Sequence, residues 1–566
     1  MQSPDPRVHG RERALQEATG SELDVLVVGG GITGVGVALD AAARGYRTAL
    51  VERDDLASGT SSRSSKLVHG GIRYLAQGDL AMVAESVRER DRLRRLAPHL
   101  VRPLPFALPT PTASRRWELK AGMLIYDALA FGRNVRRHQR LDLTALLHDA
   151  PGLARWTEGG GYRYFDCQTD DARLNLTVAL AARRHGALVA NHVEVRELLA
   201  SRGRVVGALV EDRLSGQELT LRARWVVSAT GIWADHIRQL APAAPAPQLA
   251  PSRGAHLTFP RHLLPVNGAV SFPSTFGDGR LNFAVPWGQQ VYVGTTDRPH
   301  TDGLTHPGVH TSDAEYLVQS ASAAFGVDIS VAEAVGGWAG LRPLMTGAGG
   351  LHPKDLSRRH ALVHDPGGLL TITGGKLTTY RQMAEDVVDV IAAEDGNRSR
   401  CLTSRLALGV VGDPQQGLER TRELTRSWNY PDSVARSLFQ RHGDAAPTVL
   451  ELCRRHGEDD ILVPGLPYLT GEVRWAVRHE LARTLSDVLE RRLRVAIRHA
   501  AAGGPAIAAA ARIMADELGW DDRRLSREID EYLGGVAEER GVVALDTSWR
   551  EDREAPMVPP LTDAAN

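Results

Sequence analysis

The sequence has 566 residues, too many for one hydrophobic core, so we expect about two to four domains. Its 43% apolar and 24% charged residues are ordinary for a globular protein, and its formal net charge of zero disfavours a nucleic-acid binder. The three cysteines, Cys167, Cys401 and Cys453, lie too far apart for a disulfide framework or a metal-ligand motif, so we predict no metal site.

The strongest pattern lies between residues 24 and 52. A short apolar run typical of a buried strand leads into a Gly-X-Gly-X-X-Gly turn, a helix, and a second apolar run that ends in Glu52. Gly29 permits the tight turn, Gly31 lets the backbone approach a pyrophosphate, and Gly34 lets the helix pack closely on the strand. This pattern predicts a site for FAD or NAD, with Glu52 on the ribose diol. The acid disfavours the 2′-phosphate of NADP.

A loop rich in hydroxyl groups follows. Residues 58–71 hold six Ser or Thr and three Gly, which suits a loop that contacts phosphates and the edge of a flavin. A solvated linker is the alternative, but residues 69–75 then resume structure with a His, an Arg and a Tyr close together.

Residues 113–137 combine an apolar, aromatic face with basic clusters at both ends. The aromatic residues include Trp117 and Tyr126, and the cations include Arg115, Arg116 and Lys120. A helix of this kind suits an anionic bilayer surface. Packing against its own domain explains the pattern equally well, and both alternatives stay open.

The remainder of the chain shows three kinds of secondary-structure pattern. A second buried strand at 225–231 returns toward the nucleotide, and residues 252–298 alternate as antiparallel strands of a one-sided sheet. Residues 361–392 predict a strand, a Gly-Gly turn and a helix that begins near Lys376, a second place that favours anions. From about residue 400 helices dominate, and the apolar spacing of 472–498 predicts the strongest of them.

Five segments carry a family resemblance along nearly the whole chain: 28–45, 64–75, 340–344, 374–384 and 480–492. They resemble the FAD-dependent glycerol-3-phosphate dehydrogenases. The resemblance implies FAD as cofactor, oxidation of sn-glycerol 3-phosphate to dihydroxyacetone phosphate, and electron transfer to membrane quinone.

The resemblance also implies an α/β fold: a Rossmann-like FAD-binding domain of the D-amino-acid oxidase type, an antiparallel β-sheet substrate domain, and a C-terminal α-helical domain. The expected boundaries are a loose N-terminal tail at 1–20, a discontinuous FAD-binding domain at 21–100, 160–245 and 360–395, a substrate-binding cap at 101–159 and 246–359, a helical domain at 400–545, and a tail at 546–566.

For the chemistry, a base must take the proton of the C2 hydroxyl while a hydride leaves C2, and His69 is the candidate. A structural role for His69 is the alternative. Arg342 and Lys376 are the candidate catalytic cations. The candidate substrate-binding residues are Arg73, Tyr74, Arg253, His256 and Arg342, although in so Arg-rich a chain ordinary surface arginines are the alternative. The candidate cofactor-binding residues are Gly29, Gly31, Gly34, Glu52, Thr60, Ser61, Ser62, Lys66, Gly70, Gly71, Val195, Thr230, Gly231, Gly374, Gly375, Lys376, Leu377 and Thr378.

Three functions therefore remain as alternatives. The first is a quinone-linked dehydrogenase in the cytoplasm, bound peripherally to the inner face of the cell membrane. The second is a glycerol-3-phosphate oxidase that uses O₂, and the third is a flavin-binding protein that modifies nucleic acid. We expect glycerol 3-phosphate, quinone and an anionic membrane surface as partners and no nucleic acid; a homodimer is left open.

Overall fold

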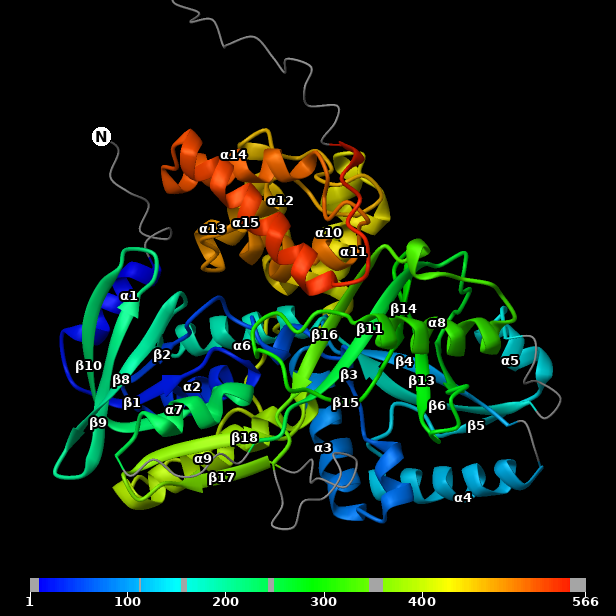
Figure 1. The fold of residues 1–566 in the computed structure, drawn as a ribbon, viewed down its shortest axis with the longest axis horizontal. Helices are drawn as coiled ribbons and strands as arrows, with labels where there is room; N and C mark the ends of the chain where they lie inside the picture. The colour runs from blue at the N-terminus through cyan, green and yellow to red at the C-terminus, as the bar shows by residue number, and fades with distance from the viewer. Residues whose placement is uncertain (1–9, 111–112, 154–159, 243–248, 346–359, 550–566) are drawn as a thin grey trace, which may run out of the picture.

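A computed structural model describes residues 10–110, 113–153, 160–242, 249–345 and 360–549. Two β-sheets lie side by side, and the C-terminal helices cover one side of both of them (Figure 1). The predictions for residues 1–9, for the 346–359 part of the cap and for the tail beyond residue 549 fall outside the described residues.

The first sheet is organised around β1 (Leu23–Val28). This strand is almost entirely buried and pairs in parallel with β2 (Thr48–Val51) on one side and β10 (Gln217–Ser228) on the other. The order across the sheet is β17-β18-β10-β1-β2-β7, and β8 and β9 extend β10 as an antiparallel ribbon. The other strands of this sheet are β7 (Leu188–Ala190), β8 (Val193–Ser201), β9 (Arg204–Asp212), β17 (His360–His364) and β18 (Leu369–Gly374).

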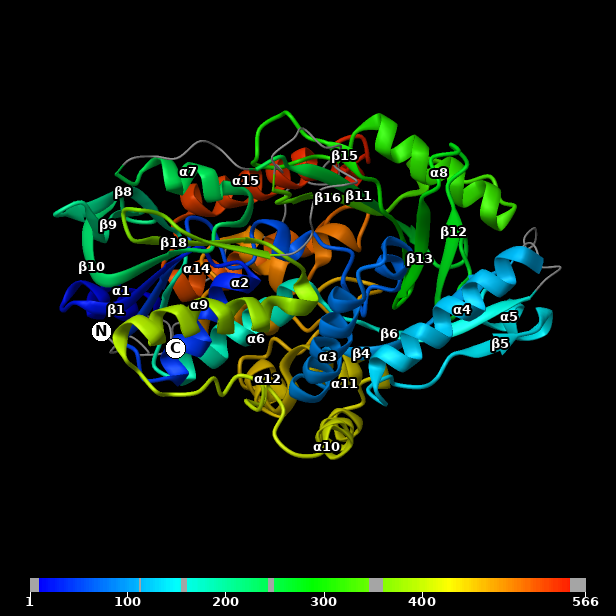
Figure 2. The same cartoon turned by 90° about the horizontal axis from the view of Figure 1, so that it is seen from below.

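Helices cover both faces of this sheet. On one face, α2 (Ile32–Ala43), α6 (Asp171–Arg184) and α9 (Tyr380–Asp395) share one apolar core with the strands (Figure 2). On the other face, α7 (Ala234–Gln239) and α1 (Gly10–Thr19) pack with the β8–β10 ribbon. A mainly parallel sheet buried on both faces explains why β1 and β2 read as continuous apolar runs.

The predicted loose N-terminus is wrong for residues 10–19, which form α1. Leu15 and Ala18 of this helix are buried against the first sheet. Arg11, only 1% exposed, donates to Asp212 and, at 2.7 Å, to the carbonyl oxygen of Asn191. The polar composition of this stretch suggested a tail. The helix could not be predicted from it because the partners of Arg11 lie about 200 residues away in the chain.

The second sheet forms the cap, in the order β15-β11-β14-β13-β12-β4-β6-β3, with β16 beside β11 and β5 beside β6. Helix α8 (Thr311–Phe325) packs on one face, and α3 (Leu80–Leu96), α4 (Ala113–Ala130) and α5 (Leu143–Asp149) surround its other end. Its strands are β3 (Leu67–Val68), β4 (Arg102–Pro109), β5 (Gln139–Leu141), β6 (Gly161–Gln168), β11 (Ser252–Pro260), β12 (Ala269–Pro273), β13 (Leu281–Trp287), β14 (Gln290–Gly294), β15 (Arg298–Pro299) and β16 (Gly336–Arg342).

One domain boundary differs from the prediction. We placed the return to the FAD-binding domain at residue 160, but β6 belongs to the cap sheet. It pairs antiparallel with β4 from Arg102–Gln168 to Pro109–Gly161, so the chain leaves and re-enters the first domain through neighbouring strands.

The C-terminal region is helical, as expected. Its helices are α10 (Pro414–Ser427), α11 (Asp432–His442), α12 (Ala446–Arg455), α13 (Glu472–His479), α14 (Ala506–Leu518) and α15 (Asp522–Arg540). The single helix predicted over 472–498 is wrong, because the α-helix ends at His479 and Leu481 adopts a φ of 61°. Glu480 leaves the helix to pair with Arg173 of α6 at 2.5 Å.

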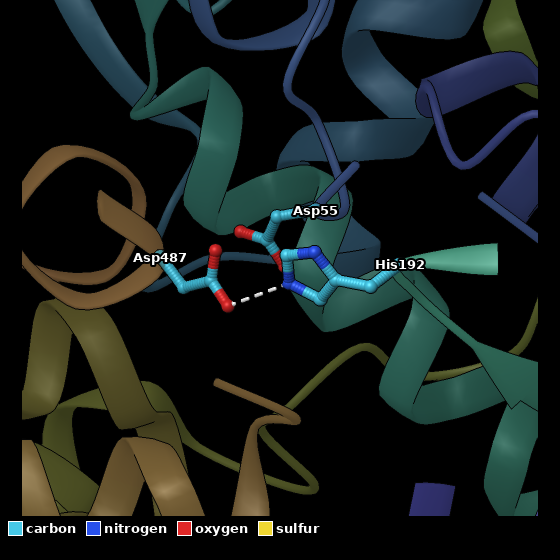
Figure 3. Close-up of side chains that lie close together, drawn as sticks. All are labelled: Asp55, His192 and Asp487. Carbon is cyan, nitrogen blue, oxygen red and sulfur yellow. Dashed lines mark hydrogen bonds and ion pairs between the residues drawn. The ribbon is translucent and has the colours of Figure 1, made fainter. Parts of the chain in front are cut away.

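A buried ion-pair network joins the helical domain to the first sheet. Asp55, His192 and Asp487 lie close enough to hold a metal ion (Figure 3). Arg491 contacts Asp55 at 2.6 Å and Asp487 at 2.9 Å, and Arg492 also pairs with Asp55. Because guanidinium groups already neutralise both carboxylates, we interpret this cluster as a domain-to-domain contact.

Candidate active site

A cavity of about 190 Å³ opens at the carboxyl ends of β1, β2, β10 and β18. Ligands of open α/β sheets bind at this edge, where helices begin and strand order reverses. The predicted cofactor residues that line it are Gly29, Gly31, Glu52, Thr60, Ser61, Val195, Thr230, Gly231, Gly374, Gly375, Lys376 and Leu377.

The three glycines of the fingerprint face different constraints. Gly29 has a φ of 108°, which L side chains rarely adopt, and a Cβ there would lie 2.8 Å from the carbonyl oxygen of Ala229. A Cβ at Gly34 would lie 1.9 Å from the oxygen of Gly29, so this glycine lets helix and strand touch. Gly31 has an ordinary φ of −70°, and a Cβ would meet only the hydroxyl of Ser61 at 3.2 Å. Gly29 and Gly34 therefore serve the fold, and Gly31 keeps space free at the helix N-terminus.

Glu52 lies at the cavity wall and holds the adjoining turns. Its carboxylate accepts the N–H of Gly30 at 2.6 Å and that of Asp54 at 3.0 Å. Burial raises the pKa of Glu52, and these hydrogen bonds oppose the rise. Ser61 accepts the N–H of Ile32 at 2.8 Å, so a loop hydroxyl contacts the first turn of α2 where a pyrophosphate would bind.

Several residues that line the cavity were not predicted from the sequence. Arg53 stacks over the ring of Trp233 at 5.0 Å, and both border the cavity with His236 and Pro343. A Cβ at Gly59 would lie 3.0 Å from the same indole, so the serine-rich loop closes against Trp233. The sequence signal for Trp233 was its place two residues after the Thr-Gly turn, but no local pattern indicates which way its ring points.

Lys66 and Ser62 do not line the cavity. Lys66 is 1% exposed, and its Nζ lies 3.1 Å from Asp171 and 2.9 Å from the carbonyl oxygen of Ser62. Burial, reinforced by the nearby charge of Arg494, lowers the pKa of Lys66 to about 8, and Asp171 opposes this. Lys66 therefore holds the hydroxyl-rich loop, residues 58–71, from its buried side.

The turn that carries His69 is held by hydrogen bonds from its backbone to side chains of distant residues. The His69 N–H donates to the hydroxyl of Thr378 at 3.1 Å, which ties the turn to the helix start after β18. The Gly70 N–H donates to Asp166 at 3.0 Å. A Cβ at Gly70 would lie 2.1 Å from the hydroxyl of Tyr126, and one at Gly71, whose φ is 75°, would lie 2.5 Å from the ring of Tyr74.

Lys376 joins this turn to the cavity. It lines the cavity, and its ammonium lies 3.9 Å from the centre of the Tyr74 ring and 3.3 Å from the hydroxyl of Ser86. The structure thus brings Lys376, Tyr74, Thr378 and the His69 turn together. The side chain of Arg73 lies outside the described part of the structure.

Arg342 ends β16 and lies across Gly254 of β11. Its guanidinium donates to Asp297 at 3.1 Å, to the hydroxyl of Thr295 at 3.2 Å and to the carbonyl oxygen of Thr296 at 3.1 Å. Pro343, the next residue, borders the cofactor cavity. Arg342 is therefore held in a fixed orientation at the boundary between the cap sheet and the cofactor cavity.

His256 and Arg253 lie on opposite faces of β11. His256 stacks on Trp338 with ring centres 4.7 Å apart and lies 2.8 Å from the hydroxyl of Ser65; burial lowers its pKa well below the usual range. Arg253 points toward α8, where its guanidinium contacts Asp313 at 3.0 Å and His310 at 2.8 Å. The structure does not bring Arg253 to Arg342, because Arg342 pairs with Ser252 across the strands and neighbouring residues of a strand point to opposite faces.

The fold and cavity define a dinucleotide-binding protein, and comparisons identify its family. A family described as "FAD dependent oxidoreductase" matches residues 24–381, and one described as "C-terminal domain of alpha-glycerophosphate oxidase" matches residues 401–525. The chain belongs to the FAD-dependent glycerol-3-phosphate dehydrogenase family.

Whole-length relatives support this assignment. The chain is 38% identical over 550 residues to the probable mitochondrial glycerol-3-phosphate dehydrogenase of Caenorhabditis elegans, covering 94% of this chain and 75% of that protein. It is 37% identical over 535 residues to the glycerol-3-phosphate dehydrogenase of Mycobacterium leprae, covering 93% and 90%. The glycerol-3-phosphate dehydrogenase from Bacillus halodurans complexed with FAD matches the structure with a TM-score of 0.79 and 30% identity, covering 94% of this chain and 98% of that one.

These findings confirm the predicted fold class and FAD as the cofactor. The cavity fits FAD for reasons of its own: Gly31 leaves the N-terminus of α2 open to a pyrophosphate, and Glu52 stands one strand away as an acceptor. Gly374 and Gly375, with φ values of 78° and 75°, let the chain turn closely around the far end of the cavity.

Proposed function

We propose that the protein oxidises sn-glycerol 3-phosphate to dihydroxyacetone phosphate and passes the electrons to a membrane quinone. The observation that carries this proposal is the junction at Lys376, where the cofactor cavity meets the His69 turn. FAD, when bound, would accept the hydride that leaves C2 of the substrate. The residues of the chain must then handle the proton, the phosphate and the developing charge.

His69 is the proposed base for the C2 hydroxyl. Hydrogen bonds from its own N–H to Thr378 and from the Gly70 N–H to Asp166 hold the backbone of the turn that carries its ring. An imidazole titrates near neutral pH, which suits proton removal. Lys376 places a positive charge beside the same site, where it would stabilise negative charge that develops during the reaction.

Arg342 is the proposed phosphate ligand. Guanidinium groups bind phosphate with paired, charge-assisted hydrogen bonds, and Arg342 is partly exposed at the edge of the cofactor cavity. Asp297, Thr295 and Thr296 fix its orientation before substrate arrives. Arg253 instead supports β11 through Asp313, so we assign it a structural role.

A matched pair of variants tests this assignment. Arg342→Met should weaken the binding of glycerol 3-phosphate or its transition state by about 2–3 kcal/mol. Arg253→Met should lower stability without a comparable effect on kcat/KM. If Arg253→Met raises KM for glycerol 3-phosphate and Arg342→Met does not, the phosphate lies on the other face of β11.

Helix α4 supports the proposed quinone acceptor. Its Met123 and Tyr126 are buried against the cap, whereas Trp117 and Leu124 are 64% and 54% exposed and Phe131, just beyond the helix, is 78% exposed. Lys120 lies 4.8 Å from the centre of the Trp117 ring, so cations accompany the exposed aromatic groups. An apolar face edged by cations is suited to peripheral binding at the anionic, cytoplasmic face of the cell membrane, where quinone would be reduced. Among the described residues, no helix is long and apolar enough to cross a bilayer.

The acceptor decides between dehydrogenase and oxidase. With glycerol 3-phosphate as donor, a short-chain ubiquinone analogue should be reduced many times faster than hydrogen peroxide forms in air. A peroxide yield equal to the substrate consumed, with slow quinone reduction, would favour the oxidase. The nucleic-acid alternative predicts a gel shift with DNA or RNA, which the neutral net charge argues against.

A further inference from the structure

A second cavity lies where the helical domain meets the cap sheet. It encloses about 60 Å³, enough for a few water molecules or one small oxyanion. Its wall brings together Arg102 at the start of β4, Arg441 of α11 and Arg498, which precedes α14. Three guanidinium groups from distant parts of the chain therefore meet at one cavity.

The three cations differ in how they are balanced. Arg441 pairs with the buried carboxylate of Glu472. Arg498 donates to the hydroxyl of Tyr468 at 2.5 Å and to the side-chain oxygen of Gln290 at 3.1 Å, both of which are uncharged. Within the described residues, the guanidinium of Arg102 has no hydrogen-bond or ion-pair partner, and burial lowers its pKa. Two of the three positive charges thus lack a carboxylate.

Other groups on the wall do not supply the missing negative charge. Asp170 caps α6 by accepting the N–H of Arg173 at 3.2 Å, and its nearest cation is Arg494 at 3.7 Å. His99 is 3% exposed; burial, with Arg173 and His442 nearby, lowers its pKa to about 3, so it stays neutral around pH 7. The positive charge of the cavity therefore comes from arginines and does not vary across the physiological pH range.

A cation that lines a cavity without a carboxylate partner is unfavourable, and two of them in one cavity also repel each other. We propose that this cavity is a binding site for a small tetrahedral oxyanion of the size of inorganic phosphate, held by Arg102 and Arg498. The small volume favours the free ion over the phosphate group of a larger metabolite. Ser437, Gln440 and Thr169 on the wall offer hydroxyl and amide groups for its other oxygens.

Occupancy would couple two domains. Arg102 begins a strand of the cap sheet, whereas Arg498 belongs to the helical region. One anion bound by both would bridge the interface and stabilise the assembled protein by mass action. This inference concerns a site separate from the cofactor cavity and does not depend on the proposed reaction.

The test measures thermal unfolding of the FAD-loaded enzyme in phosphate and in chloride at equal ionic strength. Phosphate should raise the unfolding midpoint of the wild type in a saturable way, by about 1–3 °C. Arg102→Met should lose this rise. Because it removes a half-buried cation that has no carboxylate partner, it should also unfold at the same or a higher temperature than the wild type in chloride.

Two further variants make the result specific. Arg498→Met should also lose the rise, and Arg342→Met, which changes the proposed substrate site, should keep it. The proposal is overturned if Arg102→Met retains the full phosphate effect, or if that effect disappears only in Arg342→Met. A loss of stability in chloride on replacing Arg102 would equally contradict it, because that outcome makes Arg102 a structural cation.

Discussion

The hydroxyl of Tyr126 lies 2.9 Å from a carboxylate oxygen of Asp166, and the same oxygen accepts the Gly70 N–H at 3.0 Å. Arg90 contacts both groups, with 2.8 Å to the Tyr126 hydroxyl and 2.5 Å to Asp166. Tyr126 belongs to α4, the helix with the exposed apolar face, and Gly70 follows the candidate base His69. One buried carboxylate therefore links the proposed membrane-facing helix to the candidate catalytic turn.

This relationship predicts that Tyr126→Phe impairs catalysis without loss of FAD. The variant removes a hydrogen bond to a buried carboxylate, which costs about 1.5–3 kcal/mol and loosens the turn that holds His69. We expect kcat to fall while the flavin absorbance per protein is unchanged, as measured by steady-state kinetics and visible spectroscopy.

Tyr162→Phe is the matched control. Tyr162 lies on β6, four residues before Asp166, and within the described residues its hydroxyl contacts no part of the His69 turn. It should keep the kcat of the wild type. Equal losses in both variants would mean that Tyr126 acts only through general packing.

Gly31→Val should abolish FAD binding and leave the fold intact. The φ of Gly31 is −70°, so a side chain adds no backbone strain, but it occupies the N-terminus of α2. Circular dichroism should match the wild type while the purified protein is colourless. Gly34→Ala is the contrasting variant, because its Cβ would clash with the Gly29 oxygen at 1.9 Å and should prevent folding. A Gly31→Val protein with full FAD content would refute the assignment.

Reversing the charges at Arg115, Arg116 and Lys120 to Glu should abolish binding to anionic liposomes and quinone reduction. Each cation near an anionic surface contributes roughly 1 kcal/mol, and this contribution weakens as salt is added. Flavin reduction by glycerol 3-phosphate should survive, because the cofactor cavity lies elsewhere. Co-sedimentation at rising salt measures the binding.

The control for this variant reverses Arg512, Arg523 and Arg527 to Glu on α14 and α15. These helices lie on the opposite side of the molecule from α4 (Figure 1). The control should still sediment with the liposomes. If the α4 variant sediments as well, α4 is only a packing element and the membrane contact lies elsewhere.

The buried pair of Glu472 and Arg441 predicts a pH dependence of stability. Burial alone would raise the pKa of Glu472, but the charge of Arg441 and the contact with His442 outweigh it and lower the pKa to about 2. The unfolded value is about 4.3, so the pair stabilises the protein above that pH by about 3 kcal/mol. This contribution is lost as the pH falls from about 5 toward 2.

Chemical unfolding midpoints between pH 7 and pH 3 check this prediction. Glu472→Gln should be less stable at pH 7, because it leaves Arg441 buried without a charge partner, and its midpoint should fall less steeply with acid. A slope equal to that of the wild type would show that other carboxylates account for the acid sensitivity.

The features whose positions the sequence predicted correctly are those encoded by neighbouring residues, and the roles assigned to the site residues stay predictions. Strand β1, the fingerprint glycines and Glu52 lie within about 30 residues of one another, and each has a local signature in residue type and spacing. Local spacing also distinguishes two of the candidate substrate-binding residues. Arg253 and His256 are three apart in a predicted strand, so the alternation of side chains already places them on opposite faces.

Other features depend on partners distant in the chain. Lys66 lies in a loop whose composition suits phosphate binding, but its ammonium contacts Asp171, 105 residues away. Asp55 is held by Arg491 and Arg492 over more than 430 residues, and Glu480 ends a helix to reach Arg173. In a chain this rich in arginine and acid, many pairings satisfy the same charges, and only the packed fold selects among them.

The most direct measurement of the central claim is anaerobic titration of the FAD-loaded enzyme with glycerol 3-phosphate. We expect the flavin absorbance near 450 nm to bleach with about one substrate per flavin, and an equal concentration of glycerol to bleach it far more slowly, because glycerol lacks the group that Arg342 is proposed to bind. A flavin that stays oxidised with glycerol 3-phosphate, or that glycerol reduces equally fast, would contradict the account.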